Sequence, residues 1–299
     1  MSKLSENYQG IYSLMLTPYN EDMSVDYKTY EQYTEWQAAQ GVEHLFCVCG
    51  SSEMSALTLE ERLKLAALTA KHKGDTTIVA TANMEPTWRG QIDEVKAMSQ
   101  TGVDGIVFTT RGLGDNEDRL VEYIGELKQY TDLPVFMYEF PGFRPHCISG
   151  ECYGRLVKEC GIYGIKDTTS TKEGILDKID FKGASCIIQA NMPFLFDAYL
   201  AGARGVMATP TSCGGAFFAR FHNAFISSDM SLAEQRYNEI ILLDNCIDSG
   251  FNRSAKYLVK LQGVDGFEPR SRGADSLSSA RLRSIRSFHD WCVANGLMN

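Results

Sequence analysis

The sequence predicts an α/β protein built as a (β/α)8 barrel with a C-terminal helical extension, and two patterns support this prediction. Short apolar runs alternate with longer segments of helical period eight times within the first 230 residues. The runs recur roughly every 20 to 35 residues, which is the length of one strand–helix unit. A chain of 299 residues is long enough for such a barrel and an appended helical part.

Eight segments are expected to be strands, because each is a short apolar run bounded by turn residues or polar residues. They are Ile11–Leu16, His44–Cys49, Thr77–Thr81, Gly105–Phe108, Pro134–Tyr138, Tyr163–Lys166, Ser185–Gln189 and Gly205–Ala208. Right-handed connections between parallel strands close eight such units most simply as a barrel. The alternative is an open doubly wound sheet, but the first strand leads into Thr17-Pro18 rather than a glycine-rich nucleotide-binding turn.

Caps and glycines mark the helices between these strands. Thr58 and Glu61 form a capping box at the start of one helix, and Asp26 and Ser149 are N-caps of two others. Glycine suits the left-handed position that ends a helix. The glycines that end a helix shortly before a strand are Gly41, Gly102, Gly161 and Gly202.

The strand pattern stops after about residue 230, and only helical segments follow. Residues 231–250, 252–264 and 275–296 are the three expected helices. We therefore expect a catalytic barrel domain over residues 1–230 and a helical domain over residues 231–299. The helical domain would pack against the barrel or against a neighbouring subunit.

Charge and cysteine content argue against several classes of partner. With 29 basic against 38 acidic residues the net charge is −9, so we expect neither a nucleic-acid partner nor a membrane partner. The nine cysteines include no CxxC motif, and the N-terminus has no apolar export signal, which together indicate reduced thiols in a cytoplasmic protein. The five histidines form no metal-binding pair, so we expect no metal and no cofactor.

Catalytic groups in such a barrel come from the C-terminal ends of the strands, where Lys166 and Tyr138 lie. An amine walled by apolar strands loses hydration, its pKa falls, and it can attack a ketone to form a Schiff base. The alternative is that Lys166 reaches solvent or pairs with Asp167. Tyr138 can move protons to and from Schiff-base intermediates, or it is a core residue with a satisfied hydroxyl.

Candidate anion-binding groups follow other strands. The turn of Gly50, Ser51 and Ser52 offers backbone amides and hydroxyls to a carboxylate, unless it is a plain connecting loop. Arg111 and Arg144 can each bind a second carboxylate, although loop arginines are often only solvated.

Four stretches carry a family resemblance: Leu16–Tyr19, Cys49–Glu53, Pro134–Pro141 and Tyr163–Asp167. They are similar to motifs of the dihydrodipicolinate synthase / N-acetylneuraminate lyase family of class I, pyruvate-dependent aldolases. The resemblance covers nearly the whole chain and implies a TIM barrel that assembles as a homo-oligomer, a dimer or a homotetramer. It implies that Lys166 is the Schiff-base lysine and Tyr138 the proton relay. It also implies that Ser51 lies in the pyruvate-carboxylate loop and that the Met207 carbonyl lines the pyruvate pocket.

Several positions depart from the family pattern. Gly50 stands where the family has a relay threonine, and Thr110-Arg111 stands where it often has two tyrosines. Glu139 replaces an asparagine, and Arg144 lies one position beyond the carboxylate-binding arginine of the synthases. Asn191-Met192 occupies the place of the acidic pair of the sialic-acid lyases. Because of these departures, the sequence does not identify the second substrate.

The leading expectation is a lyase or synthase that condenses or releases pyruvate, or a related small 2-oxo acid, through Lys166. A sugar-acid aldolase or dehydratase, acting on a 2-keto-3-deoxy acid or a sialic-acid-like compound, is a variant of this hypothesis. A phosphosugar aldolase or isomerase would instead use Gly214-Gly215 to cradle a phosphate. A ligand-binding protein that kept the pocket but lost turnover is the alternative from another class.

Overall fold

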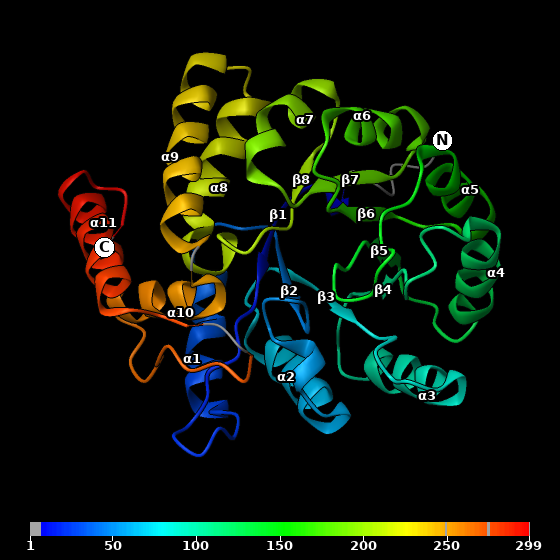
Figure 1. The fold of residues 1–299 in the computed structure, drawn as a ribbon, viewed down its shortest axis with the longest axis horizontal. Coiled ribbons are helices and arrows are strands. Elements are labelled where there is room, and N and C mark those ends of the chain that lie inside the picture. The colour runs from blue at the N-terminus through cyan, green and yellow to red at the C-terminus, as the bar shows by residue number, and fades with distance from the viewer. Residues whose placement is uncertain (1–6, 249, 274–275, 299) are drawn as a thin grey trace.

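The expected strands close into a parallel barrel in chain order, so the predicted fold class is confirmed (Figure 1). The computed structural model describes residues 7–248, 250–273 and 276–298. Its strands are β1 (Gly10–Leu14), β2 (His44–Cys47), β3 (Thr77–Thr81), β4 (Gly105–Thr109), β5 (Val135–Tyr138), β6 (Gly164–Asp167), β7 (Cys186–Gln189) and β8 (Gly205–Val206). β8 pairs with β1 and completes a (β/α)8 barrel with the topology of a TIM barrel.

The strand ends are where the sequence-based boundaries need correction. β1, β2 and β8 each stop two residues before the expected end. Beyond β2 the backbone of Val48 takes a φ of 53°, which turns the chain out of the ladder. The residues past these three ends, such as Leu16, Cys49 and Met207, are fully buried. Apolar character therefore continues after the hydrogen-bonded ladder has ended, and the sequence pattern overestimates the strands.

A helix follows every strand, and these helices cover the outside of the barrel (Figure 1). They are α1 (Tyr27–Ala38), α2 (Leu59–His72), α3 (Trp88–Ser99), α4 (Glu117–Lys128), α5 (Gly150–Cys160), α6 (Lys172–Phe181), α7 (Leu195–Ala201) and α8 (Thr211–Ile226), with short 3-10 turns η2 (Met54–Ala56) and η3 (Met192–Phe194). The expected N-caps are confirmed at Asp26, Thr58 and Ser149. Gly161 and Gly202 end α5 and α7 in the left-handed conformation, as expected.

In the described part of the chain after the barrel there are three helices: α9 (Met230–Asp248), α10 (Phe251–Leu261) and α11 (Ser279–Ala294). α9 runs beside α8, and α11 lies at the outer edge of the molecule (Figure 1). The third expected helical segment begins at residue 275, which lies outside the described residues. The division into two domains at residue 230 stays a prediction.

The N-terminal end of the barrel interior is filled by aromatic rings. Tyr12 stacks on His44 with the ring centroids 4.1 Å apart, and its hydroxyl donates to the Tyr8 carbonyl at 2.8 Å. Tyr8 makes edge contacts with Phe136 and Tyr163. This packing leaves the strand C-termini at the other end as the place for a site.

The absence of an export signal was expected from the first ten residues, of which six lie outside the described residues. Within the ranges that the structure describes, no helix is long and apolar enough to cross a membrane.

Candidate active site

Lys166 lies at the C-terminal end of β6 with its amine inside the barrel mouth. The register places it between Tyr138 of β5 and Ile188 of β7. The residue is 4% exposed, and its Nζ lies 4.3 Å from the Tyr138 ring centroid and 5.5 Å from that of Phe46. Burial lowers the pKa of the Lys166 amine to about 8. A substantial neutral, nucleophilic fraction therefore exists near neutral pH.

The carboxylate next in sequence does not pair with Lys166. Asp167 points to the far side of the strand, where its Oδ1 lies 3.3 Å from Lys178 Nζ and accepts from the Thr169 amide at 2.9 Å. Within the described residues, the Lys166 side chain has no hydrogen bond and no ion pair. The amine is thus neither solvated at a strand end nor held in a salt bridge.

Tyr138 ends β5 beside Lys166 and is 4% exposed. Its hydroxyl lies 3.0 Å from the point where a Cβ at Gly50 would stand, so the missing side chain at Gly50 leaves room for it. Burial, with a smaller contribution from Cys49, raises the pKa of the Tyr138 phenol well above its usual value. The phenol is therefore a proton donor at neutral pH, and it makes no hydrogen bond to the residues described.

The two serines of the turn after β2 have different surroundings. Ser52 Oγ accepts from the Cys49 amide at 3.0 Å and donates to the Met15 carbonyl at 2.7 Å, so it holds the turn together. Ser51 Oγ instead lies 2.9 Å from Thr209 Oγ1, at the end of β8. Ser51 thus contacts Thr209, which lines the cavity above Lys166, whereas Gly50, Ser51 and Ser52 are not themselves among the residues that line it.

A buried carboxylate, which the sequence interpretation did not single out, anchors the same turn. Glu53 has a φ of 60°, and its Oε1 accepts from Lys256 Nζ of α10 at 2.6 Å. Its Oε2 accepts from Ser271 Oγ at 2.8 Å and from the Arg272 amide at 2.7 Å. The C-terminal segment therefore fixes the position of the turn that contains Ser51.

A second buried charge cluster supports the ends of β5 and β6. Lys178 Nζ of α6 lies 3.0 Å from Glu139 Oε1 and 3.3 Å from Asp167 Oδ1. Glu139 also accepts from the amides of Ile148 at 2.9 Å and Thr168 at 3.0 Å. Burial raises the pKa of Glu139 to about 7. Glu139 is therefore an internal support for these two loops.

The two predicted arginines lie in different places. Arg111 stacks on the Phe143 ring at 4.4 Å and donates to the Met84 carbonyl at 3.2 Å. It does not line the cavity above Lys166. Arg144 does line that cavity, and its Nε has one long contact of 3.4 Å to the Pro141 carbonyl.

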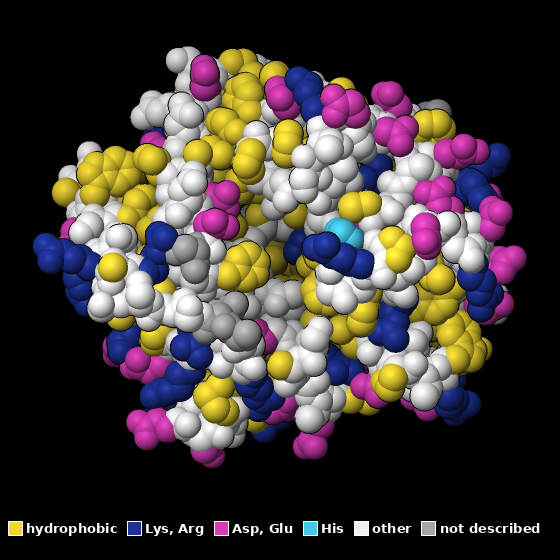
Figure 2. Space-filling view, in the orientation of Figure 1, with side chains coloured by type: hydrophobic (Ala, Val, Ile, Leu, Met, Phe, Trp, Pro, Cys, Tyr) yellow, Lys and Arg dark blue, Asp and Glu magenta, His cyan; other side chains and the backbone are white. Residues whose placement is uncertain are grey.

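A cavity of about 420 Å³ opens above the strand ends. Lys166, Tyr138 and Met207 line it together with Arg144 and Thr209. Its lining also includes three charged or titratable residues that sequence reasoning missed, which are His146, Asp244 and Asp248. The face in Figure 2 is hollowed near its centre, with acidic side chains toward α9 and basic side chains opposite.

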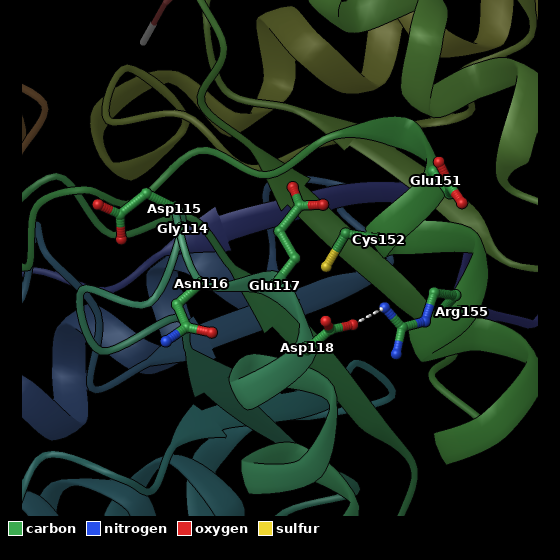
Figure 3. A pocket seen from close by; sticks show the side chains of 8 residues that line it. All are labelled: Gly114, Asp115, Asn116, Glu117, Asp118, Glu151, Cys152 and Arg155. Carbon is green, nitrogen blue, oxygen red and sulfur yellow. Dashed lines mark hydrogen bonds and ion pairs between the residues drawn. The ribbon is translucent and has the colours of Figure 1, made fainter.

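A second depression, of about 530 Å³, lies between the starts of α4 and α5 (Figure 3). Three of its charged groups already have structural partners: Asp118 pairs with Arg155 at 2.6 Å, and Glu117 accepts from the Ser149 amide at 2.7 Å. It contains none of the predicted site residues.

Close packing explains why glycines occupy positions 214 and 215. A Cβ at Gly214 would lie 2.5 Å from Leu243 Cδ2, and one at Gly215 would lie 2.9 Å from Val42 Cγ1. Both glycines are buried, Gly214 against α9 and Gly215 against the segment between α1 and β2, so the structure does not support the phosphate cradle. Across the described part of the chain, no group of three His, Cys, Asp or Glu side chains is arranged to hold a metal ion.

Comparison with known sequences places the chain in a family. Residues 7–272 match the family model described as the Dihydrodipicolinate synthetase family. The chain is 24% identical over 291 residues to the 4-hydroxy-tetrahydrodipicolinate synthase of Phenylobacterium zucineum, with 95% of this chain and 97% of that protein covered. A 25% identical match to the synthase of the same name from Gluconacetobacter diazotrophicus spans 54% of this chain and 55% of that protein.

Solved structures share the fold. YagE, a prophage protein of the dihydrodipicolinic acid synthase family from E. coli K12 solved with pyruvate, superposes with a TM-score of 0.85 at 20% identity, covering 97% of this chain and 98% of YagE. CdNal from Clostridium difficile, solved with mannosamine, gives 0.86 at 16% identity, with coverage of 95% and 98%. Because the family model spans nearly the whole barrel and reaches past α10, this chain belongs to the dihydrodipicolinate synthetase family, whose members are pyruvate-dependent lyases and synthases of the class I aldolase type that act through a Schiff base.

Proposed function

We propose that the protein is a lyase or synthase in which Lys166 forms a Schiff base with pyruvate or a related 2-oxo acid. The observation that carries the proposal is the Lys166 amine itself. It is buried at the floor of a cavity of about 420 Å³, it has no ion-pair partner within the described residues, and its pKa is lowered to about 8. A buried lysine without a counter-ion costs stability, and nucleophilic catalysis is a reason to keep it.

The proposed chemistry starts with attack of the neutral Lys166 amine on the C2 carbonyl of the 2-oxo acid. Loss of water gives an iminium ion, and removal of a C3 proton gives an enamine. In the synthetic direction the enamine carbon bonds to the carbonyl carbon of an aldehyde, whose oxygen takes up a proton. Hydrolysis of the new iminium then releases the product and regenerates the amine. Cleavage follows the same steps in reverse.

Nearby groups fit the other tasks of this reaction. The protonated Tyr138 phenol is placed to donate to the carbinolamine oxygen and to return a proton later. In this proposal the Ser51 hydroxyl, 2.9 Å from Thr209 Oγ1 of the cavity lining, holds the carboxylate together with the amides of its turn, and Met207, just past β8, forms the facing wall. Arg144 at the mouth is available to orient the second substrate.

Borohydride trapping tests the proposal directly. Incubation with pyruvate and borohydride should add one reduced pyruvyl group, detected by intact mass, and peptide mapping should locate it on Lys166. A folded protein without an adduct, tested with pyruvate and with larger 2-oxo acids, would contradict the proposal. Ligand-induced thermal stabilisation without turnover would then favour the ligand-binding alternative, which the glycine at position 50 and Thr110-Arg111 in place of relay groups also suit.

The two serines of the turn give a matched pair of variants. Ser51→Ala should raise the KM for the 2-oxo acid about tenfold or more, because a hydrogen bond to a charged group contributes about 1.5–3 kcal/mol. Ser52→Ala should instead lower the thermal midpoint, because it removes the two hydrogen bonds that hold the turn. Steady-state kinetics and thermal melts on both variants check this. An equal KM increase in both would show that Ser51 acts only through the turn.

The likeness to the family also bears on how the protein assembles and where it is located. We propose a homo-oligomer, a dimer or a homotetramer, supported by the family likeness and by exposed apolar side chains on α6 and α7, namely Phe181 and Leu200. Light scattering of the purified protein tests this. A cytoplasmic location is proposed on the same likeness and on the nine cysteines, all of which are free thiols.

A further inference from the structure

The chemistry proposed for Lys166 needs a base at one step. Once the iminium ion has formed, a proton must leave C3 to give the enamine. Tyr138 lies beside Lys166, but burial raises the pKa of its phenol well above the usual value. Among the described residues, no group donates a hydrogen bond that would stabilise a phenolate there. The phenol is therefore better suited to donating a proton than to removing one.

His146 lies on the loop after β5, and hydrogen bonds fasten that loop above the strand ends. The His146 carbonyl accepts from Thr110 Oγ1, just past β4, at 3.1 Å. Two residues further on, the Ile148 amide donates to Glu139 Oε1, just past β5, at 2.9 Å. The backbone that carries His146 is therefore held over the ends of β4 and β5, and β5 adjoins β6, which carries the proposed nucleophile.

The His146 side chain lines the cavity that also contains the Lys166 amine, and the residue is partly buried. In the part of the chain that the structure describes, neither ring nitrogen of His146 has a hydrogen bond or an ion pair. Burial lowers the pKa of the imidazole, and the positive charges of Arg144 and Lys178 lower it further, so the ring is mostly neutral at neutral pH. A neutral imidazole with an open ring nitrogen can act as a general base.

The other proton acceptors of the cavity lining come from α9. Asp244 and Asp248 lie on that helix, which packs against α8 and η3. They therefore approach from the β7–β8 side of the mouth, whereas His146 approaches from the β4–β5 side. Negative charge on the α9 side of the same cavity favours the imidazolium that forms when His146 takes up a proton.

We propose that His146 is the general base that removes the C3 proton of the iminium ion on Lys166. The C3–H bond breaks, its electron pair forms the C2–C3 double bond, and the π electrons of the C=N bond move to nitrogen. The products are the enamine and an imidazolium, which exchanges its proton with water or returns a proton to C3 in the reverse step. This inference rests on the proposed Schiff-base function, which supplies the iminium ion.

Hydrogen exchange at C3 of pyruvate isolates this step, because it requires no second substrate. The protein is incubated with pyruvate in D2O, and the loss of the methyl proton signal is followed by NMR, with the rate of a protein-free sample subtracted. Borohydride trapping on the same preparation measures the iminium ion. In His146→Gln the exchange rate should fall about 100-fold or more, while the amount of adduct stays unchanged.

A matched variant and a pH profile assign the step to the imidazole. Asp244→Asn neutralises another proton acceptor of the same cavity and should keep the exchange. At saturating pyruvate, the exchange rate of the parent protein should rise with pH around a midpoint below about 6.5, because the pKa of His146 is lowered and the neutral ring is the reactive form. His146→Gln should lose this midpoint.

Several results would overturn the inference. Unchanged exchange in His146→Gln is one, and exchange that stops only in Tyr138→Phe or Asp244→Asn, with the adduct intact, would assign the step to that group. Loss of the adduct in His146→Gln would place His146 at an earlier step. An adduct without exchange in the parent protein would show that no base acts at C3. Each of these leaves the Schiff-base function standing, whereas absence of a pyruvyl adduct on Lys166 in the parent protein contradicts that function itself.

Discussion

Lys166→Met is expected to lose turnover by about 10⁴-fold or more, because no other described side chain offers an unpaired buried amine in the cavity. The variant should also lose the borohydride adduct. Its fold should be unharmed or more stable, because methionine fills a similar volume without the cost of burying an ammonium group. Activity assays, intact mass and denaturant unfolding on the same preparation measure the three effects. Turnover close to that of the parent protein would refute the role of Lys166.

The pH dependence of borohydride trapping tests the proposed role of Lys166 by a second, independent measurement. Because the pKa of Lys166 is lowered to about 8, the neutral fraction of its amine increases as the pH rises through that value. The rate of Schiff-base formation at limiting pyruvate should therefore increase between about pH 6.5 and 8 and level off above it. For an amine of ordinary pKa, the rate of Schiff-base formation would instead keep increasing up to about pH 10. A rate that still climbs steeply at pH 9 would show that burial does not activate this lysine.

Lys178→Met is expected to lower the free energy of unfolding by about 3–5 kcal/mol, the largest stability effect we predict for a single substitution. Lys178 is the ammonium that faces both Glu139 and Asp167, and all three side chains are at most 1% exposed. Removing it leaves two buried carboxylates without a cation. One of them must then take up a proton or draw water into the structure. Urea unfolding followed by circular dichroism measures the change.

A double variant provides the control for Lys178. Adding Glu139→Gln to Lys178→Met removes one of the stranded charges, while the amide still has an oxygen for the amides of Ile148 and Thr168. Part of the lost stability should return. A loss below about 1 kcal/mol in Lys178→Met, or a double variant less stable than the single, would show that the cluster does not support the ends of β5 and β6.

Local sequence pattern was sufficient to predict the barrel and the position of the proposed nucleophile, Lys166. The apolar runs, the caps at Thr58 and Ser149 and the glycines at helix ends are properties of short stretches of chain. The position of a lysine at the end of a buried strand can likewise be predicted from a short stretch of chain. The strand ends were less predictable, because Leu16 and Cys49 stay buried after the ladder has ended. Burial and strand pairing coincide only where the backbone remains extended.

The sequence by itself determined the strand–helix order, the barrel and the placement of Lys166 and Tyr138 on adjoining strands, because each depends on local periodicity and on chain order. Only the tertiary structure decided which polar groups meet. In the folded chain Arg111 stacks on Phe143 outside the cavity lining, the Ser52 hydroxyl is hydrogen-bonded within its turn, and Lys178 contacts Glu139. The tertiary structure also brings Asp244 and Asp248 from α9 to the same cavity as Lys166. The physical reason is that side-chain contacts between distant segments depend on helix rotation and loop path, which no short-range pattern specifies.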